Sequence, residues 1–376
     1  MSATSSGNDG ESAKRVIPRV RAEIDTPALL IDIDALERNI AALRDHCHAH
    51  GAHWRPHAKS YKSSWLARKV VDAGAIGVTC AKLGEAEQFA AAGVTDLLIT
   101  CPLVGPRKLA RLVALAQHAR PMAVVDHREQ VIAISQAAAS AQVSLRILIE
   151  IDLGMQRCGV APGAAAVELG TLIHSLPNVT LAGIMGWEGH LLTINDPAEK
   201  GTKIAAAITL LQETRAALQA AGLPCEIVSA GGSGSFPWTT PLRIATEIQA
   251  GGAIFMDQFY REKCGIQSQE FALTLMSTVT SRPTEKRAVL DFGRKSLSPD
   301  LGLPKALHRS DLQPLWLSAE HAVCEVTEGA GPAIGERVEW ILGYGDWTTV
   351  LHDYYYVCRG ERVERIERLD TRGRAD

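Results

Sequence analysis

Short apolar runs alternate with amphipathic stretches over most of the chain, from about residue 25 to residue 265. Each run is rich in β-branched residues and is followed by an Ala- and Leu-rich segment with helical periodicity. This alternation is typical of successive βα units, which build a parallel sheet. The runs expected to form strands are Ala28–Ile33, Ala75–Cys80, Leu97–Cys101, Met122–Asp126, Leu145–Ile151, Thr180–Met185 and Cys225–Ser229, with His53–Pro56 and Ala253–Met256 as weaker candidates.

About eight such units fit before residue 265, which favours an α/β fold with a (β/α)8 barrel of the TIM type over an open sheet. The run Ala28–Ile33 is then expected to be the first barrel strand. After residue 270 the pattern changes to short strands between Gly- and Pro-rich turns, which indicates an all-β region. The predicted organisation is a flexible tail with a strand candidate over residues 1–24, a barrel over 25–265 and a C-terminal β domain over 266–376.

Composition and charge exclude several classes of partner. The net charge of −3 is not that of the broad basic surface required by nucleic acid. No apolar run reaches the roughly 20 residues of a membrane helix, and Met1–Gly10 lacks the apolar core of a signal peptide. The eight cysteines lack the C-x-x-C spacing of zinc sites, so we expect reduced thiols in a cytoplasmic protein.

The first candidate for chemistry is Lys59, in the segment Trp54–Lys59. This segment closes a strand-like run and precedes a helical stretch that starts near Ser64. A barrel would place Lys59 at the carboxyl end of a strand, where barrel enzymes carry their active sites. A lysine held there can form a Schiff base with a carbonyl compound. Taken alone, however, a lysine near a helix start is more often a solvated surface residue.

Two later segments carry groups that bind anions. Ala230–Phe236 directly follows the run Cys225–Ser229. The glycines of its Gly231–Ser235 stretch let backbone N–H groups approach a phosphate, while the serines add hydroxyl donors. Asp152–Val160 follows the run Leu145–Ile151 and contains Arg157, which could hold a substrate carboxylate or the phenolic oxygen of a cofactor. Each segment by itself is also consistent with an ordinary loop.

Together these segments resemble those of the fold-type III pyridoxal-phosphate enzymes, the alanine-racemase-like barrels. Within that family the chain is similar to the D-threonine aldolase/D-serine dehydratase group, and the likeness extends from about residue 25 nearly to the C-terminus. Several separate matches make it far more specific than any one motif. The further matching stretches are Asp25–Ala28, Met256–Tyr260, Asp291–Ser298, Asp300–Pro304 and Ala319–His321.

The resemblance implies that pyridoxal 5'-phosphate is joined to Lys59 and that the substrate is a small amino acid. It also implies a homodimer in which each active site lies between the barrel of one subunit and the β domain of the other. The residues expected to hold the phosphate are Gly232, Ser233, Gly234 and Ser235. The other side chains expected at the cofactor are His57, Arg157 and Tyr260.

The chain departs from the group at the metal site. Metal-dependent members bind a divalent cation through a His-x-Asp or His-x-Cys pair, and the corresponding stretch here is Gly343–Thr348. Tyr344 occupies the histidine position, while Asp346 is kept. A neutral phenol is a much poorer ligand than imidazole, so a tight metal site is not expected. Asp346 with waters could hold Mg²⁺ weakly, and His352 follows nearby as a substitute ligand.

Cleavage of a hydroxy amino acid needs a base for the substrate hydroxyl, and three residues are candidates. Glu188 and His190 follow a predicted strand, and Tyr344 replaces the metal-binding histidine. We expect His190 or Tyr344 to act in this role beside Lys59. His190 could equally be an ordinary loop histidine. Tyr61, close to the lysine, stands where the group often has histidine.

The leading hypothesis is retro-aldol cleavage of a D-3-hydroxy amino acid to glycine and an aldehyde, by breaking its Cα–Cβ bond. If the Cα–H bond breaks instead, the outcome is racemisation or, with loss of hydroxide, dehydration. An amino-acid racemase and a D-hydroxy amino acid dehydratase therefore stand as alternatives. A non-catalytic pyridoxal-phosphate carrier is a third reading, disfavoured because such carriers are usually lone barrels.

Overall fold

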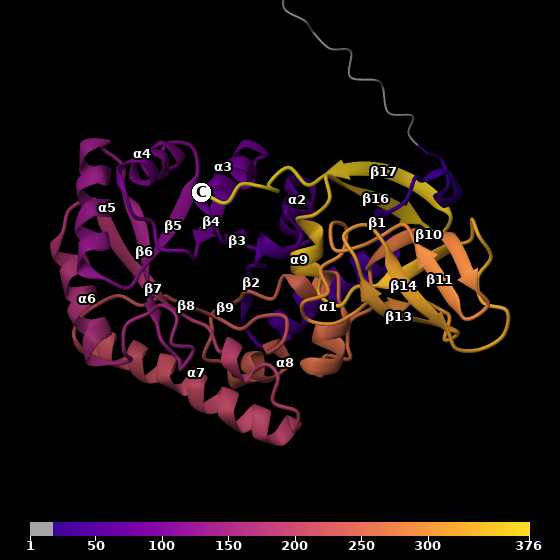
Figure 1. Ribbon diagram of the computed structural model, residues 1–376. Helices are drawn as coiled ribbons and strands as arrows, with labels where there is room; N and C mark the ends of the chain where they lie inside the picture. The colour runs from indigo at the N-terminus through magenta and orange to yellow at the C-terminus, as the bar shows by residue number, and fades with distance from the viewer. Residues whose placement is uncertain (1–17) are drawn as a thin grey trace, which may run out of the picture.

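The computed structural model describes residues 18–376, which form two sheets lying side by side (Figure 1). One is an eight-stranded parallel sheet surrounded by helices, on the left of Figure 1. The other is a nine-stranded, largely antiparallel sheet on the right. The predicted tail Met1–Gly10 lies outside the described residues. Of the strand candidate Val16–Glu23, Val20 forms an isolated bridge with Arg362, and Arg21–Glu23 form a 3₁₀ turn.

The parallel sheet closes into a barrel. Its strands follow the order β2-β9-β8-β7-β6-β5-β4-β3, and a parallel bridge between His57 and Thr79 joins the segment after β2 to β3. The predicted TIM-type barrel with a separate β region is thereby confirmed. The strands are β2 (His53–Trp54), β3 (Val78–Cys80), β4 (Asp96–Ile99), β5 (Arg120–Val125), β6 (Leu145–Ile151), β7 (Val179–Gly186), β8 (Ile227–Ala230) and β9 (Glu247–Ile248).

Helices on the outside of the barrel return the chain between strands. In the first of them, buried Leu36, Ile40, Leu43 and Cys47 recur at helical spacing and face the barrel. No helix among the described residues is both long and apolar enough to cross a membrane. The helices are α1 (Ile33–Ala49), α2 (Ser64–Asp72), α3 (Leu83–Ala91), α4 (Pro106–Leu115), α5 (Arg128–Ser140), α6 (Ala164–Ser175), α7 (Pro197–Ala220) and α8 (Phe236–Thr239).

Two predicted barrel strands are wrong. The run Ala28–Ile33 forms β1 (Ala28–Asp32), which belongs to the other sheet, between β10 (Leu273–Thr284) and β16 (Tyr354–Arg359). Because β1 is central there and buried on both faces, its sequence is a continuous apolar run, which is also the pattern of a barrel strand. The weaker candidate Ala253–Met256 overlaps a 3₁₀ turn, Gly252–Ile254, that follows the last barrel strand.

The second sheet contains one strand from before the barrel and eight from after it. β1 pairs antiparallel with β10 and parallel with β16. The predicted region of short strands after residue 270 is confirmed. Besides β1, β10 and β16, the strands are β11 (Arg287–Leu290), β12 (Lys305–Ala306), β13 (Leu312–Leu317), β14 (Ala322–Val326), β15 (Arg337–Ile341) and β17 (Arg362–Arg368). A short helix, α9 (Gly345–Thr349), follows β15.

A buried ion-pair network involves β2, β4 and β9. The guanidinium of Arg55, directly after β2, donates to Glu247 at 2.9 Å and to Asp96 at 2.6 Å. Asp96 also accepts from Arg146 at 3.2 Å. Asp96 and Glu247 are the first residues of their strands, so this network lies toward the amino ends of the strands. It joins strands that are far apart in sequence, at the end of the barrel opposite the carboxyl ends.

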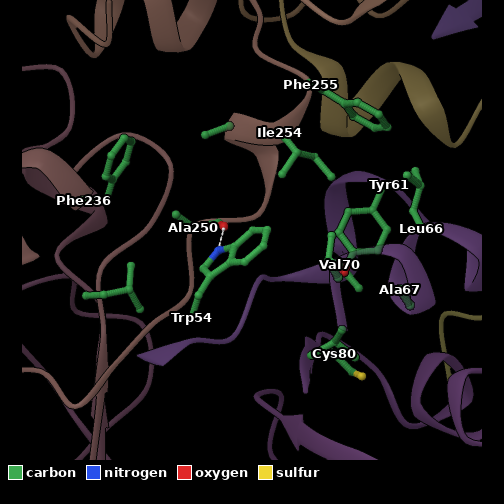
Figure 2. Close-up of a cluster of buried hydrophobic side chains, with 14 of the residues drawn as sticks. Trp54, Tyr61, Leu66, Ala67, Val70, Cys80, Phe236, Ala250, Ile254 and Phe255 are labelled. Carbon is green, nitrogen blue, oxygen red and sulfur yellow. Dashed lines mark hydrogen bonds between the residues drawn. The ribbon is translucent and has the colours of Figure 1, made fainter. Parts of the chain in front are cut away.

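Figure 2 shows the apolar cluster behind the segment that carries Lys59. The indole N–H of Trp54 donates to the carbonyl of Ala250 at 2.8 Å, which ties β2 to the chain after β9. Tyr61 lies on the same cluster beside Leu66 and Val70 of α2. The segment between Trp54 and Tyr61 is therefore anchored at both ends by buried aromatic side chains.

Candidate active site

A cavity of about 290 Å³ opens at the carboxyl ends of the barrel strands. A larger hollow of about 800 Å³ lies on the outside, between α1, α2 and β17, and none of the predicted site residues lines it. The smaller cavity occupies the position where barrel enzymes bind substrates. It is lined by His57, Lys59, Ala81, Thr100, Cys101, Pro102, Glu150, Arg157, Cys158, Met185, Gly186, Trp187, Leu192, Gly231, Gly232, Ser233, Gln249, Gly251, Gly252, Phe259, Tyr260 and Tyr344.

Lys59 lies in the wall of this cavity, on a 3₁₀ turn formed by Ala58–Ser60. Its Nζ is 3.9 Å from Oδ2 of Asp346, and its side chain is 45% exposed. Contacts from the second sheet hold this turn. The hydroxyl of Tyr355 on β16 donates to the carbonyl of Tyr61 at 2.9 Å, and the N–H of Thr371 donates to the carbonyl of Lys62.

His57 lines the cavity next to Lys59 and is neutral. Its Nδ1 accepts the backbone N–H of Lys59 at 3.3 Å. Burial holds the pKa of His57 well below its usual value, and the positive charges of Lys59, Lys62 and Arg157 lower it further. The imidazole is therefore a hydrogen-bond acceptor that orients the lysine turn.

The glycine-serine loop, Gly231–Ser235, follows β8 and presents backbone donors. Within the part of the chain that the structure describes, the N–H groups of Ser233 and Gly234 have no hydrogen-bond acceptor, and Ser233 lines the cavity. Buried N–H groups are rarely left unpaired in proteins, so these two donors are suited to bind an anion. Gly234 and Ser235 lie behind the surface of the cavity, where Ser235 Oγ accepts the N–H of Gly232 at 3.0 Å.

Gly232 cannot be replaced by a larger residue without displacing Trp187. A Cβ atom at Gly232 would lie 2.3 Å from the indole ring of Trp187, far inside van der Waals contact. The indole therefore packs directly on the backbone of the glycine-serine loop. This close approach explains the glycine, and it places the indole of Trp187 in the cavity wall next to the loop.

Arg157 reaches the cavity from the loop after β6. Its Nη2 lies 3.6 Å from Oε1 of Glu150, a residue of β6 that also lines the cavity. Burial raises the pKa of Glu150, and the charge of Arg157 opposes this. Sequence reasoning missed Glu150, although a glutamate inside the apolar run Leu145–Ile151 was a visible signal. The loop itself is held by Asp152, whose Oδ1 accepts the N–H of Gly154 at 2.9 Å.

An aromatic cluster closes the side of the cavity nearest the second sheet. The ring of Tyr344 lies edge-on to Tyr260 and Phe259, with centroids 5.9 and 5.3 Å apart. The hydroxyl of Tyr344 donates to Oδ2 of Asp346 at 3.0 Å. Burial, together with the charge of Asp346, raises the pKa of Tyr344 far above its usual value, so the phenol keeps its proton. Tyr344 and Asp346 thus form a hydrogen-bonded pair beside Lys59.

Asp346 is 8% exposed, and burial raises its pKa while Lys59 opposes the rise. Within the described residues, no three His, Cys, Asp or Glu side chains are grouped so as to hold a metal ion. The ring of His352 is engaged elsewhere, because its Nε2 lies 2.7 Å from the carbonyl oxygen of Ser296. The polar groups next to Asp346 are therefore the hydroxyl of Tyr344 and the amine of Lys59, and neither belongs to a second metal-ligating side chain.

Asp257 links the two sheets beneath this pair, and sequence reasoning gave it no role. Its Oδ1 accepts the N–H of Tyr260 at 2.9 Å, and its Oδ2 accepts the N–H of Gly345 at 2.8 Å. Burial raises the pKa of Asp257 to about 8. A single carboxyl group thus positions Tyr260 on the barrel side and the first turn of α9 on the other.

His190 and Glu188 do not line the cavity that contains Lys59 and Tyr344. His190 is exposed on a 3₁₀ turn after β7, beside Gly154, and is not among the residues that line the cavity. Glu188 is completely buried, and its Oε1 accepts the hydroxyl of Thr239 at 2.7 Å. Of the three residues predicted to be catalytic, the structure brings together Lys59 and Tyr344.

Comparison with known proteins matches both parts of the chain. The family described as alanine racemase, N-terminal domain, matches residues 31–258, and a serine dehydratase domain family matches residues 272–358. A 3-hydroxy-D-aspartate aldolase of Paracoccus denitrificans is 35% identical over 94% of this chain and 93% of its own length. A D-threonine aldolase of Arthrobacter sp. is 34% identical over 94% of both chains.

Solved structures agree with these matches. D-threonine aldolase from Filomicrobium marinum superposes with a TM-score of 0.92 at 34% identity, over 95% of this chain and 99% of that one. D-threo-3-hydroxyaspartate dehydratase from Delftia sp. HT23 gives a TM-score of 0.85 at 26% identity, over 93% and 99%. The chain therefore belongs to the alanine-racemase-like family, in the group of the D-threonine aldolases and 3-hydroxy-D-aspartate aldolases.

Proposed function

We propose that this protein is a pyridoxal-phosphate-dependent lyase that cleaves a D-3-hydroxy amino acid into glycine and an aldehyde. One observation carries the proposal: the amine of Lys59 lies beside the hydrogen-bonded pair of Tyr344 and Asp346 at the mouth of the barrel. Similarity over nearly the whole chain to two aldolases, one named for D-threonine and one for 3-hydroxy-D-aspartate, supports it.

The residues of the cavity fit the cofactor. Lys59 supplies the amine that would bind its aldehyde carbon, and the unpaired N–H groups of Ser233 and Gly234 would bind its phosphate. Arg157 would contact its ring oxygen or the substrate carboxylate. When bound, the cofactor withdraws electrons from the Cα atom of the substrate.

The pair of Tyr344 and Asp346 handles the proton of the substrate hydroxyl. Oη of Tyr344 accepts this proton while passing its own to Oδ2 of Asp346, so the phenol never carries a full negative charge. The raised pKa of Asp346, caused by burial, makes this carboxylate a stronger base than a solvated one. His57, neutral and hydrogen-bonded to the backbone of Lys59, keeps the lysine turn in place.

This proton transfer does not require a tightly bound divalent cation. The phenol of Tyr344 keeps its proton because burial raises its pKa, and a protonated phenol is a poor metal ligand. Asp346 is left as the one carboxylate of the predicted metal-binding stretch, and any Mg²⁺ it holds is weakly bound.

Dehydration is the second candidate reaction. The likeness to D-threo-3-hydroxyaspartate dehydratase favours it, because a protein of the same fold over nearly the whole chain is named for that reaction. An amino-acid racemase stands third, since the amine of Lys59 can also remove the Cα proton.

The cofactor part of the proposal is tested by absorbance in the visible range. The purified protein with added pyridoxal phosphate should form the band of a Schiff base, and sodium borohydride should fix the cofactor covalently. Lys59→Ala should lose both the band and the covalent label, whereas Lys62→Ala should keep them. A wild-type protein without this band would overturn the proposed function.

The reaction is tested by product analysis with D-threonine, D-serine and D-alanine, each with and without EDTA. An aldolase releases glycine and acetaldehyde from D-threonine, a dehydratase releases ammonia and a keto acid, and a racemase inverts D-alanine. We expect glycine, with activity largely kept in EDTA. If no β-hydroxy amino acid yields glycine, the aldolase assignment is wrong.

The working form of the protein is a homodimer. Two large apolar side chains near the mouth of the barrel are exposed: Trp347, whose ring contacts Tyr344, and Val104, two residues after the cavity-lining Pro102. In the proposed homodimer, the partner subunit would cover these two side chains. Mass photometry should report twice the chain mass, and Trp347→Glu should shift the population toward monomer.

A further inference from the structure

Lys200 is a buried cation directly behind the glycine-serine loop. It lies in the first turn of α7 and is 1% exposed. Its Nζ donates to three backbone carbonyls, those of Leu192 at 2.8 Å, Gly234 at 3.0 Å and Cys264 at 2.7 Å. One ammonium group therefore holds three segments together, and one of these is the loop that presents the unpaired N–H donors.

The charge of Lys200 has no negative partner nearby. No carboxylate of the described residues forms an ion pair with it, and its Nζ lies over the ring of Trp238, 4.1 Å from the ring centroid. Burial lowers the pKa of Lys200, which reflects the cost of keeping a charge away from water. An apolar side chain of the same size would leave three buried carbonyls without a donor, and a neutral amide would supply fewer donors. The lysine therefore combines the donors that these carbonyls need with a positive charge close to the glycine-serine loop.

The location of the ammonium connects it to the cavity. Its partner Gly234 is adjacent to Ser233, and both residues have backbone N–H groups without an acceptor in the described chain. Its partner Leu192 lines the same cavity as Ser233. Because Nζ binds the carbonyl oxygen of Gly234, it fixes the orientation of the peptide that follows the two free donors.

We infer that Lys200 is a positioning residue for the phosphate of the cofactor, and that it makes the site select a phosphorylated ligand over the same ligand without phosphate. This rests on the proposed function. The ammonium holds the donors of the glycine-serine loop in place and adds an unpaired positive charge behind them. An anion bound in front of the loop is attracted to this charge, which water does not screen in a buried setting.

The test compares two ligands that differ only in the phosphate. Protein freed of cofactor with hydroxylamine is titrated with pyridoxal phosphate and with pyridoxal, and the Schiff-base band reports binding of each. Lys200→Met removes the charge and keeps most of the apolar stem. We expect pyridoxal phosphate to bind about tenfold more weakly or worse, and pyridoxal to bind within about twofold of wild type. Inorganic phosphate should also compete less well in the variant.

Lys203→Met is the matched control, since Lys203 is exposed on the same helix and pairs with Glu199. It should leave the affinities of both ligands unchanged. If Lys200→Met fails to fold, Lys200→Gln keeps donors for the carbonyls without the charge and should show the same selective loss.

Three outcomes would overturn the inference. Equal weakening of both ligands would make Lys200 a purely structural tie between loops. Unchanged affinity for both ligands would remove any role at the phosphate. A wild-type protein that forms no band with either ligand would instead overturn the proposed function, and the inference with it.

Discussion

Tyr344 occupies the position where the resemblance predicts a metal-binding histidine. Its neighbours indicate that the phenol takes part in proton transfer. It donates to Asp346, which in turn lies 3.9 Å from the amine of Lys59. The phenol, the carboxylate and the amine can each donate or accept a proton, and they lie next to one another. The substrate hydroxyl would be the fourth member of this chain.

Tyr344→Phe should lower kcat for glycine release by about 10²- to 10⁴-fold, the usual contribution of a general acid or base. The ring contacts with Tyr260 and Phe259 remain in this variant, so the Schiff-base band should be unchanged. Tyr356→Phe, on β16, serves as the control. A Tyr344→Phe enzyme with normal kcat would show that another group accepts the proton.

Tyr344→His should create a dependence on divalent cations, because an imidazole next to Asp346 restores a pair of metal-ligand types. Activity of the variant should rise with added Mn²⁺ and fall with EDTA, while the wild type responds little to either. Calorimetry should detect Mn²⁺ binding to the variant. Absence of binding would mean that the backbone at α9 does not let the two side chains converge.

The site residues that belong to local sequence motifs could be predicted. Those whose partners lie far away along the chain were missed. Lys59, Arg157 and Ser233 follow strands within a few residues, so their positions at the mouth of the barrel could be anticipated. Asp257 acts on Gly345, which lies far along the chain, and no local pattern reveals such a partner. His190 follows a strand as expected, but its exposed side chain lies beside Gly154 and does not line the cavity.

Among the elements, most strands of the barrel were recognisable because they stand between amphipathic helices. The two-residue strand β9 was not predicted, since it is short and has only 3₁₀ turns on either side. β1 was assigned to the wrong sheet, because a strand buried on both faces looks the same in either. The assignment needed knowledge of its hydrogen-bonding neighbours, β10 and β16. Those pairings depend on tertiary structure, which periodicity does not contain.

Glu247→Ala should lower the free energy of unfolding by about 3 kcal/mol, because it takes a carboxylate away from the buried guanidinium of Arg55. Asp96 still pairs with that guanidinium, which limits the loss. Urea unfolding followed by circular dichroism measures the change. Glu270→Ala removes an exposed partner of Arg38 and should leave the midpoint nearly unchanged. Similar midpoints for both variants would mean that the buried network adds little to stability.

At the scale of the whole molecule, His352 links stability to pH. Burial lowers its pKa below the usual value, while Nε2 contacts the carbonyl of Ser296. At a pH just below the usual histidine pKa of about 6.5, the unfolded chain binds a proton that the folded chain does not. The free energy of unfolding therefore falls as the pH drops through this range.

His352→Gln removes this proton uptake. Between pH 7.5 and pH 5.5, the variant should lose about 1 kcal/mol less of its unfolding free energy than the wild type. Buried carboxyl groups with raised pKa values, such as Asp257, act in the opposite direction, but they are common to both proteins and cancel in the difference. Parallel curves of stability against pH would show that His352 does not contribute.

The position of β1 in the second sheet affects the order in which the protein folds during its synthesis. Its neighbours β10 and β16 leave the ribosome only after the entire barrel has been synthesised. Since domains tend to fold as units during synthesis, β1 waits without partners while the barrel assembles. Tyr344, Asp346 and the anchors of the lysine turn on Tyr355 and Thr371 also lie after the barrel in the chain, and after β10. Lys59 is therefore synthesised long before the other residues of the active site, which delays catalysis until the second sheet has been synthesised.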